Sequence, residues 1–254
     1  MKNTIKNLGF QDSNVCKNIL NSLEDTKIAS GSISRICNIK DISMFFNDII
    51  DAKGEVTASK IMINIIILAE KQYDSMEDNE IYNRVSHCLL ETSQMWRRFG
   101  TKDKALLKGS LKEIHDRLSL IQKKLDNPCV CIDYPNQILS LEETIQGYHV
   151  VLAHDTHELL ECGHYLRNCV GEYPERCVNS QCYVLFVKQD SRYKAAIEIA
   201  TDMRLVQVKK FANKPLDGEL AVVVFEWLNK HKEINTSKCI DYYALWKYVC
   251  LFQQ

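Results

Sequence analysis

Two different sequence patterns meet at residues 158–173, a stretch rich in Cys, His, Gly and Tyr. Before it, apolar residues recur mainly at steps of three and four, which places them on one side of a helix. After it, residues 182–188, 193–200 and 205–211 are rich in β-branched and aromatic residues and are joined by short polar turns. The sequence therefore predicts an α+β protein: an N-terminal all-α helical region followed by a small antiparallel β-meander packed with helices.

Several further elements follow from the same patterns. Residues 103–126 show the clearest helical spacing, and residues 57–73, apolar nearly all round, favour a central buried helix over a strand because of their length. Residues 147–153 predict a strand, residues 136–146 a short helix or turn, and residues 157–168 a helix capped by Asp155-Thr156. Two final helices are expected at 219–231 and 240–252, covering one face of the sheet.

The domain boundary is expected at Asn127-Pro128, where periodic helical sequence gives way to an extended segment. Proline disfavours helical geometry in the residue before it. We therefore expect a helical domain over residues 1–127 and an α+β domain over residues 128–254.

Composition excludes some classes of protein. The net charge of −1 provides no general attraction to nucleic acid or acidic lipid, so such contacts need a local patch. The N-terminus resembles no secretory signal, and the longest apolar run, residues 61–69, is too short to span a bilayer. The eleven cysteines then predict reduced, mostly buried thiols in a cytoplasmic protein without a membrane segment or cofactor.

Cys169 is the candidate nucleophile, and His164 the nearest histidine in sequence. Five residues correspond to about 500° of helical rotation, so these two side chains would not share a helix face. Cys169 is also expected at a helix C-terminus, where the helix dipole opposes a thiolate. We therefore favour a buried structural thiol at a tight turn, with Gly171 supplying backbone freedom.

A zinc site is the alternative chemistry for this region. It has enough potential ligands, but no Cys-x-x-Cys and no recognisable zinc spacing, so no metal is expected. The potential ligands are Cys162, His164, Cys169, Cys177 and Cys182.

Basic residues are concentrated in the predicted strands. Residues 188–214 contain seven Lys or Arg against three Asp or Glu, with aromatic residues among them, a pattern that suits phosphate contact and base stacking. Lysines on edge strands also protect against aggregation. Period two places Lys209 on the face of Gln207, and we expect it to reach solvent there, with Asn213 at the end of the strand.

The residues from about 134 to 227 carry a recognisable pattern. Its core is Gly163, Leu166, Cys169, Val170, Gly171 and Tyr173, followed by the strand 184–187, by 206–208 and by Ala212-Asn213-Lys214-Pro215. This pattern resembles the PcfJ-like family of conjugative plasmids and phages. Family members often have His before the Cys, where this chain has Asn168.

The resemblance, together with the basic strands, implies an accessory protein of a mobile element that binds nucleic acid or a nucleotide, in DNA transfer or against a host defence. Two alternatives remain open: a cysteine-dependent enzyme centred on Cys169, and an inhibitor that binds a host or mobile-element protein through the helical half. The expected ligand-binding residues are Arg167, Asn168, Gly171, Tyr173, Arg192, Gln207, Lys209 and Asn213.

Overall fold

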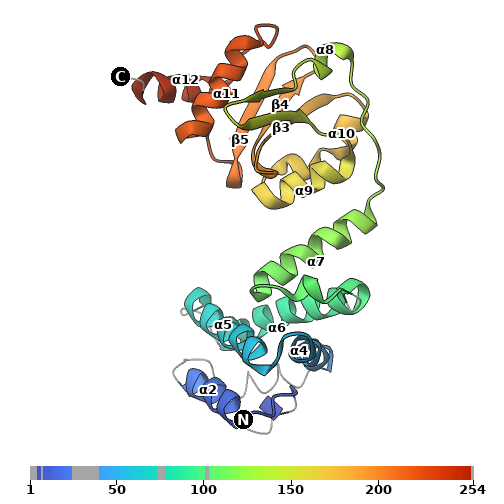
Figure 1. The fold of residues 1–254 in the computed structure, drawn as a ribbon, viewed down its shortest axis with the longest axis vertical. Coiled ribbons are helices and arrows are strands. Elements are labelled where there is room, and N and C mark those ends of the chain that lie inside the picture. The colour runs from blue at the N-terminus through green and yellow to red at the C-terminus, as the bar shows by residue number, and fades with distance from the viewer. Residues whose placement is uncertain (1–4, 7, 25–39, 74–77, 101–102, 253–254) are drawn as a thin grey trace. The chain divides into compact units, whose positions relative to one another are not determined.

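The computed structural model describes residues 5–6, 8–24, 40–73, 78–100 and 103–252. Contacts within the chain divide it into two compact units, Met1–Gln122 and Lys123–Gln254. The first unit contains helices, and the second contains a sheet packed with helices (Figure 1). The predicted fold class, helical at the N-terminal end and α+β at the C-terminal end, is therefore confirmed.

The helices of the first unit surround a core of buried aromatic and aliphatic side chains. Phe45, Phe46 and Trp96 are almost fully buried, and the indole nitrogen of Trp96 donates a hydrogen bond to Asp48 at 2.7 Å. Residues 57–73 are helical, as their length predicts. The elements are α2 (Ser13–Glu24), α4 (Lys40–Lys53), α5 (Glu55–Tyr73), α6 (Asp78–Met95), a π-turn (Trp96–Gly100), η2 (Lys104–Leu107) and α7 (Leu111–Asp126).

The prediction of one helix over residues 103–126 is wrong at its start. The short 3₁₀ helix η2 comes first, and Gly109 then takes a left-handed φ of 86°. The helix α7 begins at Leu111 behind a capping box: the Ser110 N–H donates to Glu113 Oε2 at 2.6 Å, and the Glu113 N–H donates to Ser110 Oγ at 3.3 Å. The spacing of apolar residues continues across this break, so the spacing alone does not reveal that the helix starts only at Leu111.

The second unit contains a five-stranded antiparallel sheet in the order β1-β2-β3-β4-β5. The predicted meander corresponds to β3 (Cys182–Gln189), β4 (Arg192–Ala200) and β5 (Leu205–Lys210), and the strand predicted at 147–153 is β2 (Tyr148–Leu152). Residues 136–146 form the short helix α8 (Asn136–Leu139) and then an unpredicted strand, β1 (Glu143–Ile145). Gln146 and Gly147, both at positive φ, make the two-residue turn that joins β1 to β2.

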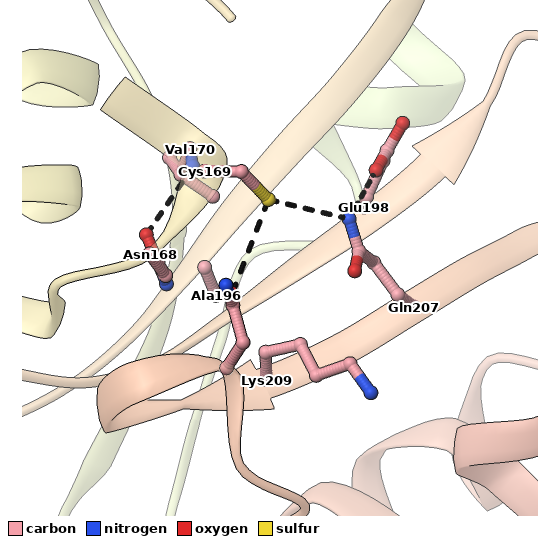
Figure 2. A pocket seen from close by; sticks show the side chains of 8 residues that line it. Asn168, Cys169, Val170, Ala196, Glu198, Gln207 and Lys209 are labelled. Carbon is pink, nitrogen blue, oxygen red and sulfur yellow. Dashed lines mark hydrogen bonds between the residues drawn. The ribbon is translucent and has the colours of Figure 1, made fainter. Parts of the chain in front are cut away.

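Helices cover both faces of this sheet, which corrects the expectation of one covered face. Val184, Phe186 and Ala196 pack with α9 (Thr156–Leu166) and α10 (Pro174–Val178), and Ala196 can be seen beside the pocket in Figure 2. Leu185 and Val187 point the other way, into a core built with α11 (Gly218–Lys230) and α12 (Ile240–Phe252). A strand buried on both faces reads as continuous apolar sequence, so alternation cannot be used to assign its faces.

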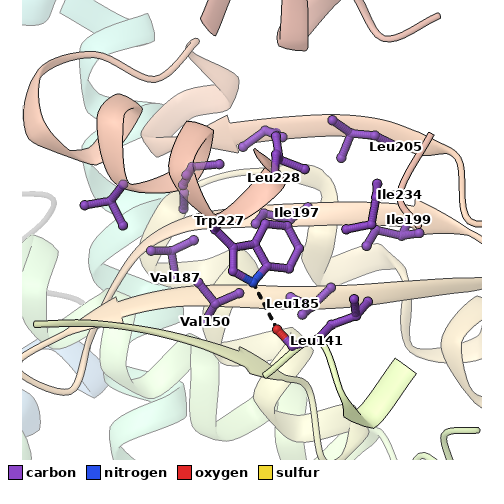
Figure 3. Close-up of a cluster of buried hydrophobic side chains, with 14 of the residues drawn as sticks. Leu141, Val150, Leu185, Val187, Ile197, Ile199, Leu205, Trp227, Leu228 and Ile234 are labelled. Carbon is purple, nitrogen blue, oxygen red and sulfur yellow. Dashed lines mark hydrogen bonds between the residues drawn. The ribbon is translucent and has the colours of Figure 1, made fainter. Parts of the chain in front are cut away.

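The larger core centres on Trp227 of α11 (Figure 3). Its indole nitrogen donates a hydrogen bond to the Leu141 carbonyl at 3.0 Å, which fixes the loop before β1 over the sheet. A buried indole N–H needs such a partner. The face of the sheet that packs against α11 and α12 is therefore covered by buried side chains of the same unit.

The predicted boundary at residues 127–128 leads to an expected result for limited proteolysis. Cys129, Val130 and Cys131 are exposed, whereas α7 is continuous up to Asp126. A protease that cuts exposed extended chain should therefore cleave first within residues 127–134. First cleavage of the native protein in the middle of α7 would contradict the boundary.

Candidate functional site

A small pocket opens between the end of α9 and the strands β4 and β5 (Figure 2). Its interior is about 10 Å³, roughly the space that one water molecule needs. It can therefore admit one small group of a ligand, but not a whole ring. Its lining residues are Asn168, Cys169, Val170, Ala196, Glu198, Gln207, Lys209 and Asn213.

The turn that follows α9 positions Asn168 and Cys169. The helix ends at Leu166 because Arg167 takes a left-handed conformation, φ 49°, and the Arg167 and Asn168 N–H groups both donate to the Gly163 carbonyl. Asn168 then caps the short helix η3 (Cys169–Glu172), since its Oδ1 accepts the Val170 N–H at 3.2 Å. Cys169 is therefore the first residue of η3, and not at a helix C-terminus as predicted.

Two glycines allow α9 and η3 to touch along their backbones. A Cβ on Gly163 would lie 2.2 Å from the Gly171 nitrogen and 2.4 Å from its Cα. Gly171 itself is not at positive φ. The predicted role of Gly171, backbone freedom, is therefore wrong. The close contact between the two backbones requires that residue 163 carry no side chain, and Gly171 packs against Gly163.

Glu198 of β4 is the centre of a hydrogen-bonded network behind the pocket. Its side chain is only 4% exposed. Arg176 donates to Oε1 at 2.8 Å, while Tyr173 and Gln207 donate to Oε2 at 3.0 and 2.7 Å. The hydrogen bond with Glu198 raises the pKa of Arg176, and burial, followed by the contact with Cys169, raises the pKa of Tyr173. A buried carboxylate with three donors is fixed in one position.

The Cys169 thiol lies at the edge of this network. Its sulfur is 3.5 Å from the Tyr173 hydroxyl and 4.0 Å from both Gln207 Nε2 and Asn213 Oδ1. A nucleophilic thiol needs a base to take its proton. The described residues that line the pocket include no histidine, and the raised pKa of Tyr173 opposes a phenolate base. The geometry thus places a thiol beside polar groups, with no histidine base among the residues that line the pocket.

The sequence of this chain matches one known protein family. The model of PcfJ-like proteins matches residues 88–224, more than half of the chain. The chain belongs to the PcfJ-like family. The match begins at Cys88 in α6, well before the resemblance read from the sequence at residue 134, and it contains every residue that lines the pocket. No curated protein and no solved structure matches this chain.

The fold of this PcfJ-like protein brings most of the predicted ligand-binding residues together. Asn168, Gln207, Lys209 and Asn213 line the pocket, and Tyr173 joins them through Glu198. The other three predicted residues do not line the pocket. Arg167 is exposed with its guanidinium 5.7 Å from the Phe211 ring, Gly171 packs against Gly163, and Arg192 is exposed at the β3–β4 turn.

His164, the predicted histidine partner of Cys169, is not among the pocket-lining residues; its ring lies 5.5 Å from that of Tyr165. Within the described part of the chain, no three His, Cys, Asp or Glu side chains are placed to hold a metal ion. The same residues contain no helix with the length and apolarity needed to cross a bilayer.

The basic strands are less positive in the structure than in the sequence, because acidic residues from other elements pair with them. Lys188 lies 3.7 Å from Glu158, and Lys210 pairs with Asp217. Lys209 donates to Asp241 of α12 at 2.6 Å and is 25% exposed. Lys209 therefore reaches solvent only in part, because α12 supplies a carboxylate that pairs with it.

Sequence reasoning missed Glu198 as a site residue. In the sequence it alternates with Ile197 and Ile199, a pattern that indicates the polar face of a strand. The signal available was the continuous apolar run of the neighbouring strand, residues 183–187, which indicates a sheet buried on both faces. A Glu in such a sheet needs partners, which Arg176 and Tyr173 provide. Phe211, two residues before the pocket-lining Asn213, is one of the aromatic residues among the basic strands and was not predicted as a site residue.

Proposed function

We propose that this protein is an accessory protein of a mobile element, a phage or a conjugative plasmid, and that its pocket binds single-stranded nucleic acid or a nucleotide. The observation that carries the proposal is a buried donor without a partner. Asn168 lines the pocket, and its Nδ2 is buried and makes no hydrogen bond within the described part of the chain. The orientation of the amide is fixed, since Oδ1 accepts the Val170 N–H. A ligand oxygen would recover the roughly 1–3 kcal/mol that an unsatisfied buried donor costs.

The rim of the pocket suits a base that lies outside and inserts only its edge. Phe211 is 47% exposed and begins η4 (Phe211–Asn213), whose last residue, Asn213, lines the pocket. Ala212 and Asn213 both take left-handed φ values of 56°, so the chain turns sharply between rim and pocket. A base stacked on Phe211, beside the Arg167 guanidinium, could place a carbonyl oxygen towards Asn168. The small interior excludes the ring itself.

The wider role rests on the family. Membership of the PcfJ-like family supports a mobile element as the context, and nucleic-acid binding there would serve DNA transfer or counteract a host defence. A pocket thiol without a histidine base beside it supports binding over catalysis. If the protein is instead an inhibitor that binds another protein through its helical unit, we expect that it does not bind nucleic acid.

The binding proposal has a direct test with a matched control. Phe211→Ala should weaken binding of a labelled single-stranded DNA or RNA oligonucleotide about tenfold, because base–aromatic stacking contributes about 1–3 kcal/mol. Tyr243→Ala removes a more exposed aromatic, 64% exposed, from α12. Tyr243 does not line the pocket, so this change should leave affinity unchanged. Fluorescence anisotropy measures both. Equal affinities for the two variants would contradict this site, and no binding of any oligonucleotide would favour the protein-binding alternative.

Salt supplies a second readout in the same assay. Since Lys188, Lys209 and Lys210 already have acidic partners, we expect only two or three phosphate contacts. The affinity should then fall roughly tenfold between about 50 and 200 mM salt. Arg192 and Lys214, both exposed, are the residues to replace here, because changing Lys209 would remove the cation that pairs with Asp241.

A further inference from the structure

Two buried thiols outside the pocket face each other beneath a short exposed turn. The sulfur of Cys177, in α10, lies 3.8 Å from that of Cys182, the first residue of β3. Both side chains are 1% exposed, whereas residues 178–181 between them are all exposed. Ser180 takes a left-handed φ of 51°, and its N–H donates to the Cys177 carbonyl at 3.0 Å. This tight turn places the two sulfurs together.

We propose that Cys177 and Cys182 form an oxidative modification site, at which hydrogen peroxide converts the two thiols into a reversible disulfide. A disulfide bond is about 2.05 Å long, so the sulfurs would need to approach by roughly 2 Å. Such a movement is within the reach of side-chain rotation and a small shift of the exposed turn. Peroxide is small enough to cross a single layer of residues that a bulky disulfide reagent would not cross.

The local electrostatics assign different roles to the two thiols. The hydrogen bond from Cys177 lowers the pKa of Cys182 against the effect of burial, and the nearby Arg176 lowers it further. The same hydrogen bond, with burial, raises the pKa of Cys177. With Cys177 as the donor of this hydrogen bond, Cys182 is the thiol that reacts first, since the thiolate is the nucleophile.

The reaction balances with peroxide as the oxidant. The Cys182 thiolate attacks one peroxide oxygen; an S–O bond forms, the O–O bond breaks, and hydroxide leaves and takes up the proton lost by Cys182. The Cys177 sulfur then attacks the Cys182 sulfenic sulfur, forming the S–S bond. The hydroxide expelled takes the Cys177 proton and leaves as water. Two thiols and one peroxide thus give one disulfide and two waters, and a dithiol such as dithiothreitol reverses the oxidation.

The test uses the native full-length protein and peptide mapping. After mild peroxide treatment, the protein is unfolded, alkylated and digested with trypsin, which cleaves after Arg176 and Lys188 and leaves both cysteines in one peptide, residues 177–188. We expect this peptide to be unalkylated and lighter by two hydrogen atoms, and dithiothreitol to restore full alkylation. In Cys177→Ala, the sulfenic acid on Cys182 should persist and be trapped by dimedone when the oxidised protein is unfolded in its presence.

The matched control is Cys162→Ala, which removes another buried thiol of the same core. Its peptide 177–188 should oxidise as in the unaltered protein. The proposal is overturned if the peptide stays fully alkylated under conditions that oxidise the exposed Cys129 and Cys131, or if the disulfide forms only after the protein is unfolded. Since the mapping of the unaltered protein decides this outcome, failure of a variant to fold would not affect it.

Discussion

Replacing Gly163 by alanine should lower the free energy of unfolding of the C-terminal unit by about 3 kcal/mol. The new Cβ would lie 2.2 Å from the Gly171 nitrogen and 2.4 Å from its Cα, and both are backbone atoms that no side-chain rotation can move away. Alanine is about 1 kcal/mol better than glycine within a helix, so the expected loss is what remains after that gain. Denaturant unfolding measures it.

Gly171→Ala is the matched control, on the other side of the same contact. A Cβ on Gly171 would lie 3.4 Å from the Gly163 Cα and 3.9 Å from the carbonyl carbon of Gly163 and the carbonyl oxygen of Leu160. These distances are ordinary van der Waals contacts. We expect a change of less than about 1 kcal/mol. Equal effects of the two substitutions, or a Gly163→Ala protein as stable as the unaltered one, would show that the two backbones do not meet as described.

Glu198→Gln should cost about 2–3 kcal/mol of unfolding free energy, although it keeps the shape of the side chain. Tyr173 and Gln207 both donate to Oε2, and Arg176 donates to Oε1. An amide NH₂ in place of either oxygen would face a donor that has lost its acceptor. The expected cost is below that of a fully buried pair, because the Arg176 side chain is 41% exposed and water can replace part of its bond.

Glu175→Gln is the control for this change, since Glu175 is exposed on α10 next to Arg176. Its stability should change by no more than about 0.5 kcal/mol. If Glu198→Gln proved equally harmless in the same denaturant titration, the carboxylate would not be the centre of the network.

The sequence predicted those parts of the fold that depend on local patterns. Strands β3 to β5 and their turns follow from β-branched residues and short polar connections, and the C-terminal helices from apolar spacing. The start of α7 was missed, because Leu107 and Leu111 keep the helical period while Gly109 breaks the backbone. The second covered face was missed, because a strand buried on both sides carries no alternation.

The candidate site could be predicted only in part, for a related reason. Asn168, Tyr173, Gln207 and Asn213 were predicted as polar residues near turns and strand ends, and the structure places them in or beside one pocket. That they bind a ligand stays a prediction. Glu198 and the partners of the lysines were not found, because the distance between Lys209 and Asp241 depends on where α12 packs. Long-range pairing of this kind requires the three-dimensional fold.

The central claim, that ligand occupies the pocket beside Cys169, is tested most directly by the alkylation rate of that thiol. Cys169 is half-buried and lines the pocket, whereas Cys129 and Cys250 are exposed elsewhere and serve as internal controls. A saturating single-stranded oligonucleotide should slow iodoacetamide modification of Cys169 about tenfold, in proportion to the fraction of protein left unbound, and should leave both controls unchanged. An oligonucleotide that binds without slowing Cys169 would contradict the claim, and a free-protein rate at Cys169 far above both controls would favour a cysteine-dependent enzyme.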